Sequence, residues 1–275
     1  MEGKKLQQWR FIPYQKYTPA WNMAIDEAIM IAHQEGKVPP TVRFYGWNPA
    51  TLSIGYFQKA QKEVDFEELK RYGLGFVRRI TGGRAVLHDQ ELTYSVIVSE
   101  DHPLIPPTVS ESYRVISQSL VQGFQNLGME ALMSPPKHQP ATSTAACFDS
   151  PSDYELVLKG KKVAGSAQVR KQGIVLQHGS ILLDMDVDLL FSVLRFPSER
   201  VKERLKEAFT KKAVAINQLR SEKVGLEEVI TAFRAGFTDG MGLDLIDSTL
   251  TAYEEELAQK LVVEKYNHPD WNLRR

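Results

Sequence analysis

The sequence predicts an α+β fold of mostly antiparallel sheets flanked by helices, and three observations favour this class. Apolar segments of strand length follow one another at short intervals between residues 41 and 98, and again between 154 and 183. Two longer segments in the first half repeat apolar residues at helical spacing, and the chain from Asp186 onward shows mainly helical spacing. Because no internal repeat and no long linker divides the 275 residues, we expect a single domain.

The N-terminal half begins with a short strand at 10–13, followed by a helix with clear start signals. Thr18 is a suitable N-cap and Pro19 suits the first helical turn, so we expect a helix over 20–33. The later elements follow from their apolar spacing and turn residues. They are strands at 41–47 and 51–57, a short helix from Asp65 to about Gly73, strands at 75–80, 84–88 and 91–98 arranged as an antiparallel meander, and a helix at 110–127 that Gly128 ends.

A polar segment separates the two halves of the sequence. Residues 134–146 contain three prolines and almost no apolar side chain, so we expect a mobile or ligand-ordered loop that leads to Cys147. Beyond it, Gly160 and Gly173 mark turns between strands, and helical spacing follows. The predicted elements are strands at 154–159, 162–169 and 174–183 and helices at 186–195, 198–210, 225–239 and 250–265.

The composition restricts the function. The apolar fraction is 43%, as in ordinary globular proteins, and 34 Lys and Arg residues balance 34 Asp and Glu residues. Because the net charge is zero, we expect neither nucleic acid nor an anionic membrane as a partner. The sequence has no signal-peptide pattern and no apolar segment of membrane-spanning length, and its single cysteine excludes an intrachain disulfide. We therefore expect a cytoplasmic protein.

Cys147, the only cysteine, is a candidate nucleophile. A lone cysteine is more often a small buried apolar residue. Its neighbours argue for exposure, because it follows a polar loop and begins the turn-rich run Cys-Phe-Asp-Ser-Pro-Ser-Asp. A thiol with an ordinary pKa of about 8.5 is only slightly ionised at neutral pH, so a reactive cysteine needs a cation nearby.

Lys162 is the candidate cation. Alternation along the strand 162–169 places Lys162 and Ser166 on one face and Gly165 and Ala167 on the other. The second face is the more apolar one and is expected in the core, so Lys162 would look into a cleft. The other interpretation, a turn lysine that serves solubility, stays open.

The segment 79–89, Arg-Ile-Thr-Gly-Gly-Arg-Ala-Val-Leu-His-Asp, is a second candidate for the site. Gly82 and Gly83 interrupt a strand, and their missing Cβ atoms would let the backbone approach a ligand. A tight turn is the simpler interpretation, since Gly-Gly alone is a weak signal. The sequence contains no metal-ligand spacing, P-loop, G-x-S-x-G elbow or intact G-x-G-x-x-G, so we expect neither a metal nor a cofactor.

Three ordered motifs resemble those of the lipoate and biotin protein ligase superfamily. They are the segment 78–89, the segment Gly160-Lys-Lys-Val-Ala-Gly-Ser-Ala167, and the segment His178-Gly-Ser-Ile-Leu-Leu183. The segments 42–47 and 147–149 are most similar to the octanoyltransferases of Gram-positive bacteria. The resemblance implies the ligase-type catalytic domain over about 40–200. With an N-terminal helix and a helical extension over about 200–275, it makes 1–275 one catalytic domain.

The resemblance also implies a reaction. The family is understood to move an octanoyl group from acyl carrier protein onto a cysteine, and from there onto a lysine of a lipoyl domain, chiefly that of the glycine cleavage system H protein. By this match Cys147 would carry the thioester and Lys162 would be the active-site lysine of a monomeric enzyme. The residues implied in substrate binding are Arg79, Thr81, Gly82, Gly83, Arg84, Ala85, Val86, His88, Asp89, Gly165, Ser166 and Ala167.

Three alternatives to this reaction stay open. An ATP-dependent lipoate ligase commonly carries a third glycine where this chain has Arg84, and it needs no nucleophile such as Cys147. An arginine side chain there crowds the backbone approach to an adenylate phosphate. An amidotransferase that moves octanoyl between lipoyl domains would use the same cysteine chemistry. A non-catalytic acyl-binding regulator would bind its ligand without a covalent adduct.

Overall fold

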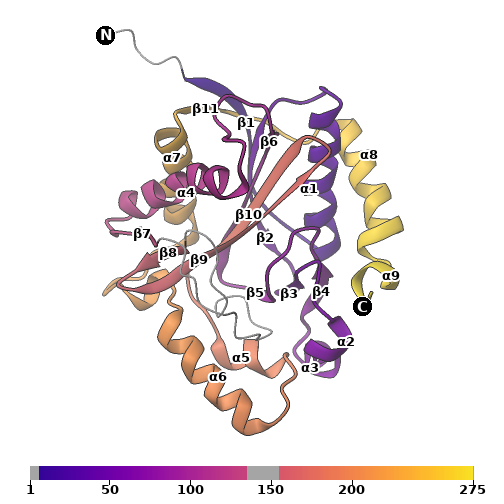
Figure 1. Cartoon of the computed structure of the whole chain (residues 1–275), viewed down its shortest axis with the longest axis vertical. Helices are drawn as coiled ribbons and strands as arrows, with labels where there is room; N and C mark the ends of the chain where they lie inside the picture. The colour runs from indigo at the N-terminus through magenta and orange to yellow at the C-terminus, as the bar shows by residue number, and fades with distance from the viewer. Residues whose placement is uncertain (1–5, 135–154, 275) are drawn as a thin grey trace.

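A large mixed sheet forms the centre of the molecule (Figure 1). The structure is a computed structural model that describes residues 6–134 and 155–274. The strand order in this part of the chain is β11 (Leu243–Asp247), β1 (Gln7–Tyr17), β2 (Thr41–Trp47), β6 (Glu91–Ser99), β10 (Ile174–Leu182), β9 (Lys161–Lys171), β8 (Glu155–Leu158) and β7 (Leu132–Ser134). β1 pairs in parallel with β11 and β2, and the other neighbours are antiparallel. The prediction of an α+β fold with mostly antiparallel strands is confirmed.

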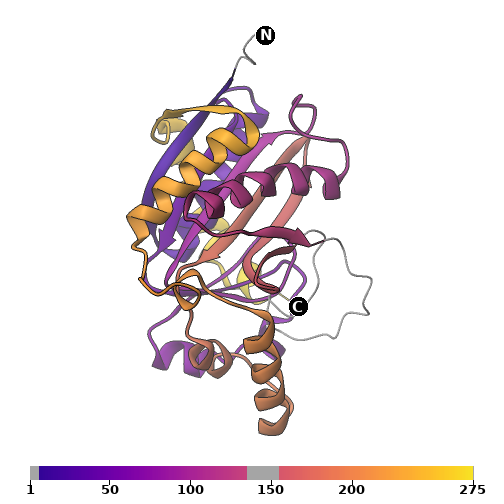
Figure 2. The same cartoon turned by 90° about the vertical axis from the view of Figure 1, so that its left-hand side faces the viewer.

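Helices cover both faces of this sheet. α4 (Val109–Asn126) and α7 (Leu226–Met241) pack together on one face, and α1 (Pro19–Gln34) and α8 (Ala252–Leu261) on the other (Figures 1 and 2). α1 begins after Thr18 with proline in its first turn, as the sequence predicts. No helix in the described part of the chain is long and apolar enough to cross a membrane.

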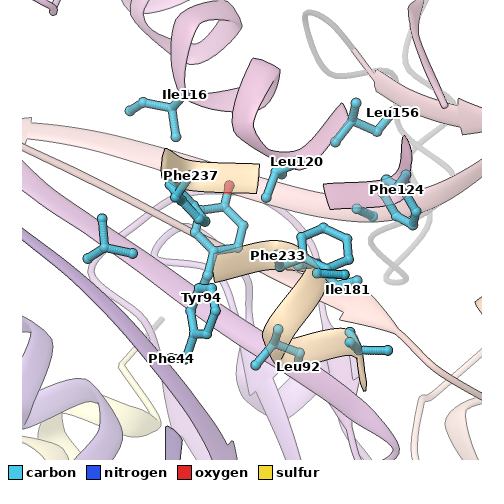
Figure 3. Close-up of a cluster of buried hydrophobic side chains, with 14 of the residues drawn as sticks. Phe44, Leu92, Tyr94, Ile116, Leu120, Phe124, Leu156, Ile181, Phe233 and Phe237 are labelled. Atoms are coloured by element: carbon cyan, nitrogen blue, oxygen red, sulfur yellow. The ribbon is translucent and has the colours of Figure 1, made fainter. Parts of the chain in front are cut away.

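The main apolar core fills the space between the sheet and the α4–α7 pair (Figure 3). Aromatic side chains from the strands and from α7 meet there, as with the ring centroids of Tyr94 and Phe237, 5.7 Å apart. The two helices approach closely at Gly123 and Gly236, because a Cβ on Gly236 would lie 2.6 Å from the Gly123 nitrogen. This core holds β6, β9 and β10, the strands that carry much of the candidate site, in a fixed position.

A second, smaller sheet corrects one prediction. Its order is β4 (Gly75–Arg78), β3 (Thr51–Ile54) and β5 (Val86–His88). β3 pairs in parallel with β4 and antiparallel with β5, while β6 belongs to the large sheet. The antiparallel meander expected from 75–80, 84–88 and 91–98 is therefore wrong. The pairing partners of these strands lie outside the segment, which local spacing does not reveal.

Two short helices link the strands of the small sheet. α2 (Ala60–Glu63) and α3 (Phe66–Arg71) connect β3 to β4, and Asp65 caps α3 by accepting from the backbone nitrogens of Glu67 and Glu68. The predicted helix start at Asp65 is thus confirmed. β4 in turn presents the guanidinium of Arg78, fully buried, to backbone carbonyls of residues 55–58 and of the C-terminal segment 271–274.

The C-terminal region contains the predicted helices and one strand that the sequence analysis did not predict. α5 (Val187–Ser192), α6 (Glu199–Lys212), α7 and α8 correspond to the four predicted helices. Shorter helical segments are η2 (Ile216–Gln218), η3 (Val262–Tyr266) and α9 (Pro269–Asn272). β11 lies between α7 and α8 and extends the large sheet beside β1. Five residues are too few to distinguish a strand from a connection by spacing alone.

The contact between α4 and α7 gives a prediction for stability. Gly236→Ala should lower the free energy of unfolding by about 1–2 kcal/mol. The added methyl group would overpack the contact with α4, and this destabilisation is larger than the stabilisation from the better helix propensity of alanine. Urea unfolding measures this. Ala235→Ser, which adds one atom on the exposed side of the same helix, is the control and should change stability little. A Gly236→Ala protein as stable as the parent would contradict the close contact.

Candidate active site

The two sheets enclose a pocket at the place where β5 faces β9 and β10. It contains about 360 Å³ of space free of atoms, part of it open to solvent, and its surface is mainly apolar. Its lining residues are Met23, Tyr45, Trp47, Arg79, Val86, His88, Thr93, Gly165, Ser166, Ala167, His178, Gly179 and Ser180.

The Gly82–Gly83 turn forms one edge of this region. Gly83 has φ +93°, which favours glycine, and a Cβ on Gly82 would meet no atom. The turn packs backbone against backbone on Gly55, where a Cβ would lie 2.1 Å from the carbonyl oxygen of Gly83. Nη2 of Arg79 donates to the carbonyls of Gly82 (3.2 Å) and Arg84 (2.9 Å). The turn is therefore fixed by its packing on Gly55 and by the hydrogen bonds from Arg79, and the space beside Gly82 is open.

A hydrogen-bond relay, the Glu91 relay, supports the turn through Arg79. The carboxylate of Glu91 lies 2.6 Å from Nδ1 of His88, and Nε2 of His88 lies 2.6 Å from Oγ of Ser53. Nη1 of Arg79 donates to the same Ser53 oxygen at 2.5 Å. Since arginine only donates, the Ser53 oxygen accepts from Arg79, and the same hydroxyl is hydrogen-bonded to Nε2 of His88. The ring of His88 stacks on Trp47 with centroids 4.3 Å apart.

A second relay, the Asp26 relay, reaches the turn from the other side. Oγ1 of Thr81 lies 2.7 Å from Nε2 of His178, and Nδ1 of His178 lies 3.5 Å from a carboxylate oxygen of Asp26. Arg43 donates to that carboxylate at 2.7 Å. All four side chains are buried. Burial alone would raise the pKa of Asp26, but the Arg43 guanidinium and His178 hold it below its usual value.

A β-bulge in β9 decides which way Lys162 faces. Leu156 of β8 pairs with Ala164, whereas the next residue, Val157, pairs with Lys162, so Val163 is the extra residue. Val163 and Ala164 both lie in the core under α4 and α7. Because two successive residues share that face, the alternation shifts by one and Lys162 falls on the opposite face.

The same bulge corrects the predicted faces of the strand. Gly165 and Ala167 line the pocket, although the sequence analysis placed them in the core. Ser166 borders the pocket too, but its hydroxyl accepts a hydrogen bond from Tyr94 at 2.8 Å on the α4 side. The expectation that Lys162 and Ser166 share one face is wrong, since simple alternation does not count the bulged residue. Lys162 instead shares the face of Gly165 and Ala167.

Lys162 is buried and ion-paired. It is 5% exposed, and its Nζ lies 3.1 Å from a carboxylate oxygen of Glu155. Its backbone carbonyl accepts from the nitrogen of Val214, which fixes the start of β9 against the segment after α6. Cys147 lies outside the described residues, as does the predicted loop at 134–146 apart from Ser134.

The predicted substrate-binding residues fall into three places. Arg79, Val86, His88, Gly165, Ser166 and Ala167 line the pocket, and Thr81, Gly82, Gly83 and Arg84 form the turn at its edge. Ala85 is buried in a separate apolar cluster around β3 and α5, and Asp89 is exposed. These two border a neighbouring hollow in front of α5.

Sequence reasoning missed several residues of the site. His178 was quoted as part of a motif but not singled out, although a histidine within an apolar strand is itself a signal. Asp26 lies on the buried side of α1 and Glu91 at the start of β6, and no local pattern marks either of them. Among the described residues, no group of three or more His, Cys, Asp or Glu side chains could hold a metal ion.

The burial of His178 predicts a pH dependence of stability. Burial lowers the pKa of His178, Asp26 opposes the shift, and Arg79 and His88 add to it. As the pH falls below about 6.5, the unfolded chain gains a proton that the folded chain does not bind, so stability is lost toward acid. His178→Gln should therefore flatten the decline between pH 7 and 5, by at most about 1.4 kcal/mol per pH unit.

Urea unfolding at several pH values measures this decline. Equal urea dependence of the unfolding free energy in both proteins is the control for comparable native states. Two parallel pH curves would show that His178 does not contribute.

Known proteins share this architecture and sequence. The profile described as the lipoyl protein ligase A/B catalytic domain matches residues 18–238. Proteins named octanoyltransferase LipM are 61% identical in Brevibacillus brevis, over 98% of this chain and 100% of the relative, and 53% identical in Bacillus subtilis, over 97% and 98%.

Solved structures agree. A bipartite lipoate protein ligase from Thermoplasma acidophilum, studied with its E2 lipoyl domain, matches with a TM-score of 0.81 and 29% identity over 98% of both chains. Lipoate-protein ligase A bound with ATP matches with a TM-score of 0.80 and 28% identity over 97% and 99% of the two chains. The predicted ligase-type fold is confirmed, and the chain belongs to the lipoyl protein ligase A/B catalytic domain family.

Proposed function

We propose that this protein is an octanoyltransferase that acts in protein lipoylation through a thioester on Cys147. The observation that carries the proposal is the 53–61% identity to octanoyltransferases over nearly the whole chain. An apolar pocket lined by the same face of β9 that carries Lys162 supports it, because an eight-carbon acyl chain needs an apolar slot.

The pocket is suited to the acyl tail. Gly165 and Ala167 leave room on the β9 side, while Met23 and Trp47 add apolar surface opposite them. The polar side chains that reach the pocket, such as His88 and His178, are hydrogen-bonded to other protein groups. Their polar atoms therefore need no solvent when an apolar chain fills the space.

The chemistry follows from a thiol and a lysine. The Cys147 thiolate, stabilised by the Lys162 ammonium, attacks the carbonyl of the octanoyl thioester, and a new C–S bond forms as the carrier's C–S bond breaks. The leaving thiolate takes a proton from Lys162. An acceptor lysine in its amine form then attacks, neutral Lys162 removes a proton from its nitrogen, and the Cys147 thiolate leaves as the amide forms.

The oxyanion of each step needs donors at a fixed place. The backbone nitrogens of the Gly82–Gly83 turn are our candidates, since the turn is rigid and has open space beside Gly82. This assignment gives a reason for the two glycines in the motif, because residues without a side chain leave these backbone nitrogens uncovered.

The partners are two carrier proteins. We propose octanoyl-acyl carrier protein as the donor and the lipoyl domain of the glycine cleavage system H protein as the acceptor of a monomeric, single-domain, cytoplasmic enzyme. Because the second thioester is similar in free energy to the first, no ATP and no cofactor is needed. Each partner must leave after its step, so both are expected to bind weakly.

An ATP-dependent lipoate ligase is the main alternative, because one structural relative is a ligase bound with ATP. Arg84 and Cys147 favour the transferase. Arg84 stands where those ligases commonly have a third glycine, and ATP activation requires no cysteine.

Intact-protein mass spectrometry after mixing with octanoyl-acyl carrier protein, without ATP, tests the proposal. We expect an increase equal to one octanoyl group, absent in Cys147→Ser. Lys162→Gln should slow its formation by about 10²- to 10⁴-fold, as the loss of a proton-transfer group does. Lys161→Gln is the matched control, since Lys161 donates to the Thr210 carbonyl of α6 and should act like the parent.

Two results would contradict the proposal. Acylation that requires ATP and free octanoate would identify a ligase. An octanoyl adduct that persists in Cys147→Ser would exclude the thioester. Supplying octanoylated lipoyl domains instead of acyl carrier protein separates the amidotransferase from the proposed reaction.

The pocket assignment predicts a change of chain-length preference. Ala167→Leu adds three carbons to the pocket wall and should slow transfer of octanoyl about tenfold or more, while butyryl transfer changes little. Competition between the two acyl carrier thioesters measures the ratio. An unchanged ratio would show that the tail binds elsewhere.

A further inference from the structure

The Asp26 and Glu91 relays converge on the same short segment, residues 79–84. The Glu91 relay ends in Arg79, which donates to two carbonyls of the turn. The Asp26 relay ends in Thr81, the residue directly before Gly82. Two buried carboxylates from different elements, α1 and β6, thus act on one turn from opposite sides.

The donors around Asp26 fix the proton on His178. Arg43 and Ser95 donate to one carboxylate oxygen, at 2.7 and 2.9 Å, and Tyr45 donates to the other at 3.0 Å. An ionised carboxylate only accepts, so the ring nitrogen that faces Asp26, Nδ1, carries the proton. Nε2 of the neutral ring is then an acceptor.

The acceptor at Nε2 determines what Thr81 does. Its hydroxyl donates to Nε2 of His178 at 2.7 Å, while its backbone carbonyl accepts from the nitrogen of Tyr56 at 2.8 Å. Thr81 is fully buried and held at both its side chain and its backbone. These two bonds hold the peptide group that joins Thr81 to Gly82 and thereby the direction of the Gly82 nitrogen. The next peptide group, which carries the Gly83 nitrogen, is held by the bond from Arg79 to the Gly82 carbonyl.

We propose that Asp26 and His178 are positioning residues for acyl transfer, which they serve by holding Thr81 and thereby the backbone nitrogen of Gly82. This inference rests on the proposed function. The role is electrostatic positioning: Asp26 selects the His178 tautomer, His178 orients Thr81, and none of the three reacts. The charged and titratable groups that face His178 are Asp26 of α1, Arg43 and Tyr45 of β2, Arg79 after β4 and His88 of β5.

Substitutions of Thr81 distinguish the effect of its hydrogen bond to His178 from the effect of its packing. Thr81→Val keeps the shape but removes the donor, so the rate of acyl-enzyme formation at saturating octanoyl-acyl carrier protein should fall about 10- to 100-fold with little change in KM. Thr81→Ser keeps the hydroxyl and should recover most of the rate. Thr41→Val is the control, because it removes an equally buried hydroxyl at the start of β2, where Thr41 accepts from Arg10 and not from a residue of either relay.

A spectroscopic measurement tests the relay without activity. In ¹⁵N NMR of the histidine rings, His178 should be neutral at pH 7 with the proton on Nδ1. The Nε2 resonance should shift in Thr81→Val more than in Thr81→Ser, since only the first variant removes its donor.

Three results would overturn the inference: a wild-type rate in Thr81→Val, no recovery in Thr81→Ser, or a proton on Nε2 of His178. Failure of the proposed function is distinct from these. It would appear as a parent protein that forms no octanoyl adduct, and the nitrogen shifts would then still decide whether the relay exists.

Discussion

A carboxylate buried away from water needs hydrogen-bond donors, and this requirement at Asp26 and Glu91 organises the interior between the two sheets. Asp26 gathers donors from β2, β6 and β10, and Glu91 gathers the hydroxyls of Thr93 and Ser180 together with His88. Each donor set joins strands that are distant in the sequence: β2, β6 and β10 at Asp26, and β5 and β6 with β10 at Glu91. The pocket exists because these polar groups satisfy one another and leave the surface in front of them apolar.

The Gly82–Gly83 turn and Lys162 are held in place by different contacts. The contact of Gly55 with Gly83 fixes the turn on the small sheet. The buried guanidinium of Arg78 fixes the C-terminal segment to the same sheet. Lys162 belongs to a different region, at the bulged start of β9. The Gly82–Gly83 turn and Lys162 are therefore held by separate parts of the fold.

The relatives of this chain include proteins named octanoyltransferases and solved lipoate protein ligases, so the same scaffold occurs in both. The similarity of the fold to a ligase bound with ATP shows how little of the architecture depends on the activation step. The differences that we propose between the two reactions lie in the sequence at Arg84 and Cys147.

Local signals in the sequence determined the elements: Thr18 and Pro19 started α1, Asp65 started α3, and the spacing of apolar residues gave most helices and strands. The motifs also identified the Gly82–Gly83 turn and the family. Only the tertiary structure decided which strands pair, that β5 leaves β6 for a second sheet, and that a bulge puts Lys162 on the same face of β9 as Gly165 and Ala167. Pairing and bulges depend on partners distant in the chain, and so do the contacts that give Asp26 and His178 their meaning, because each acquires its role only from atoms that folding brings within hydrogen-bond distance.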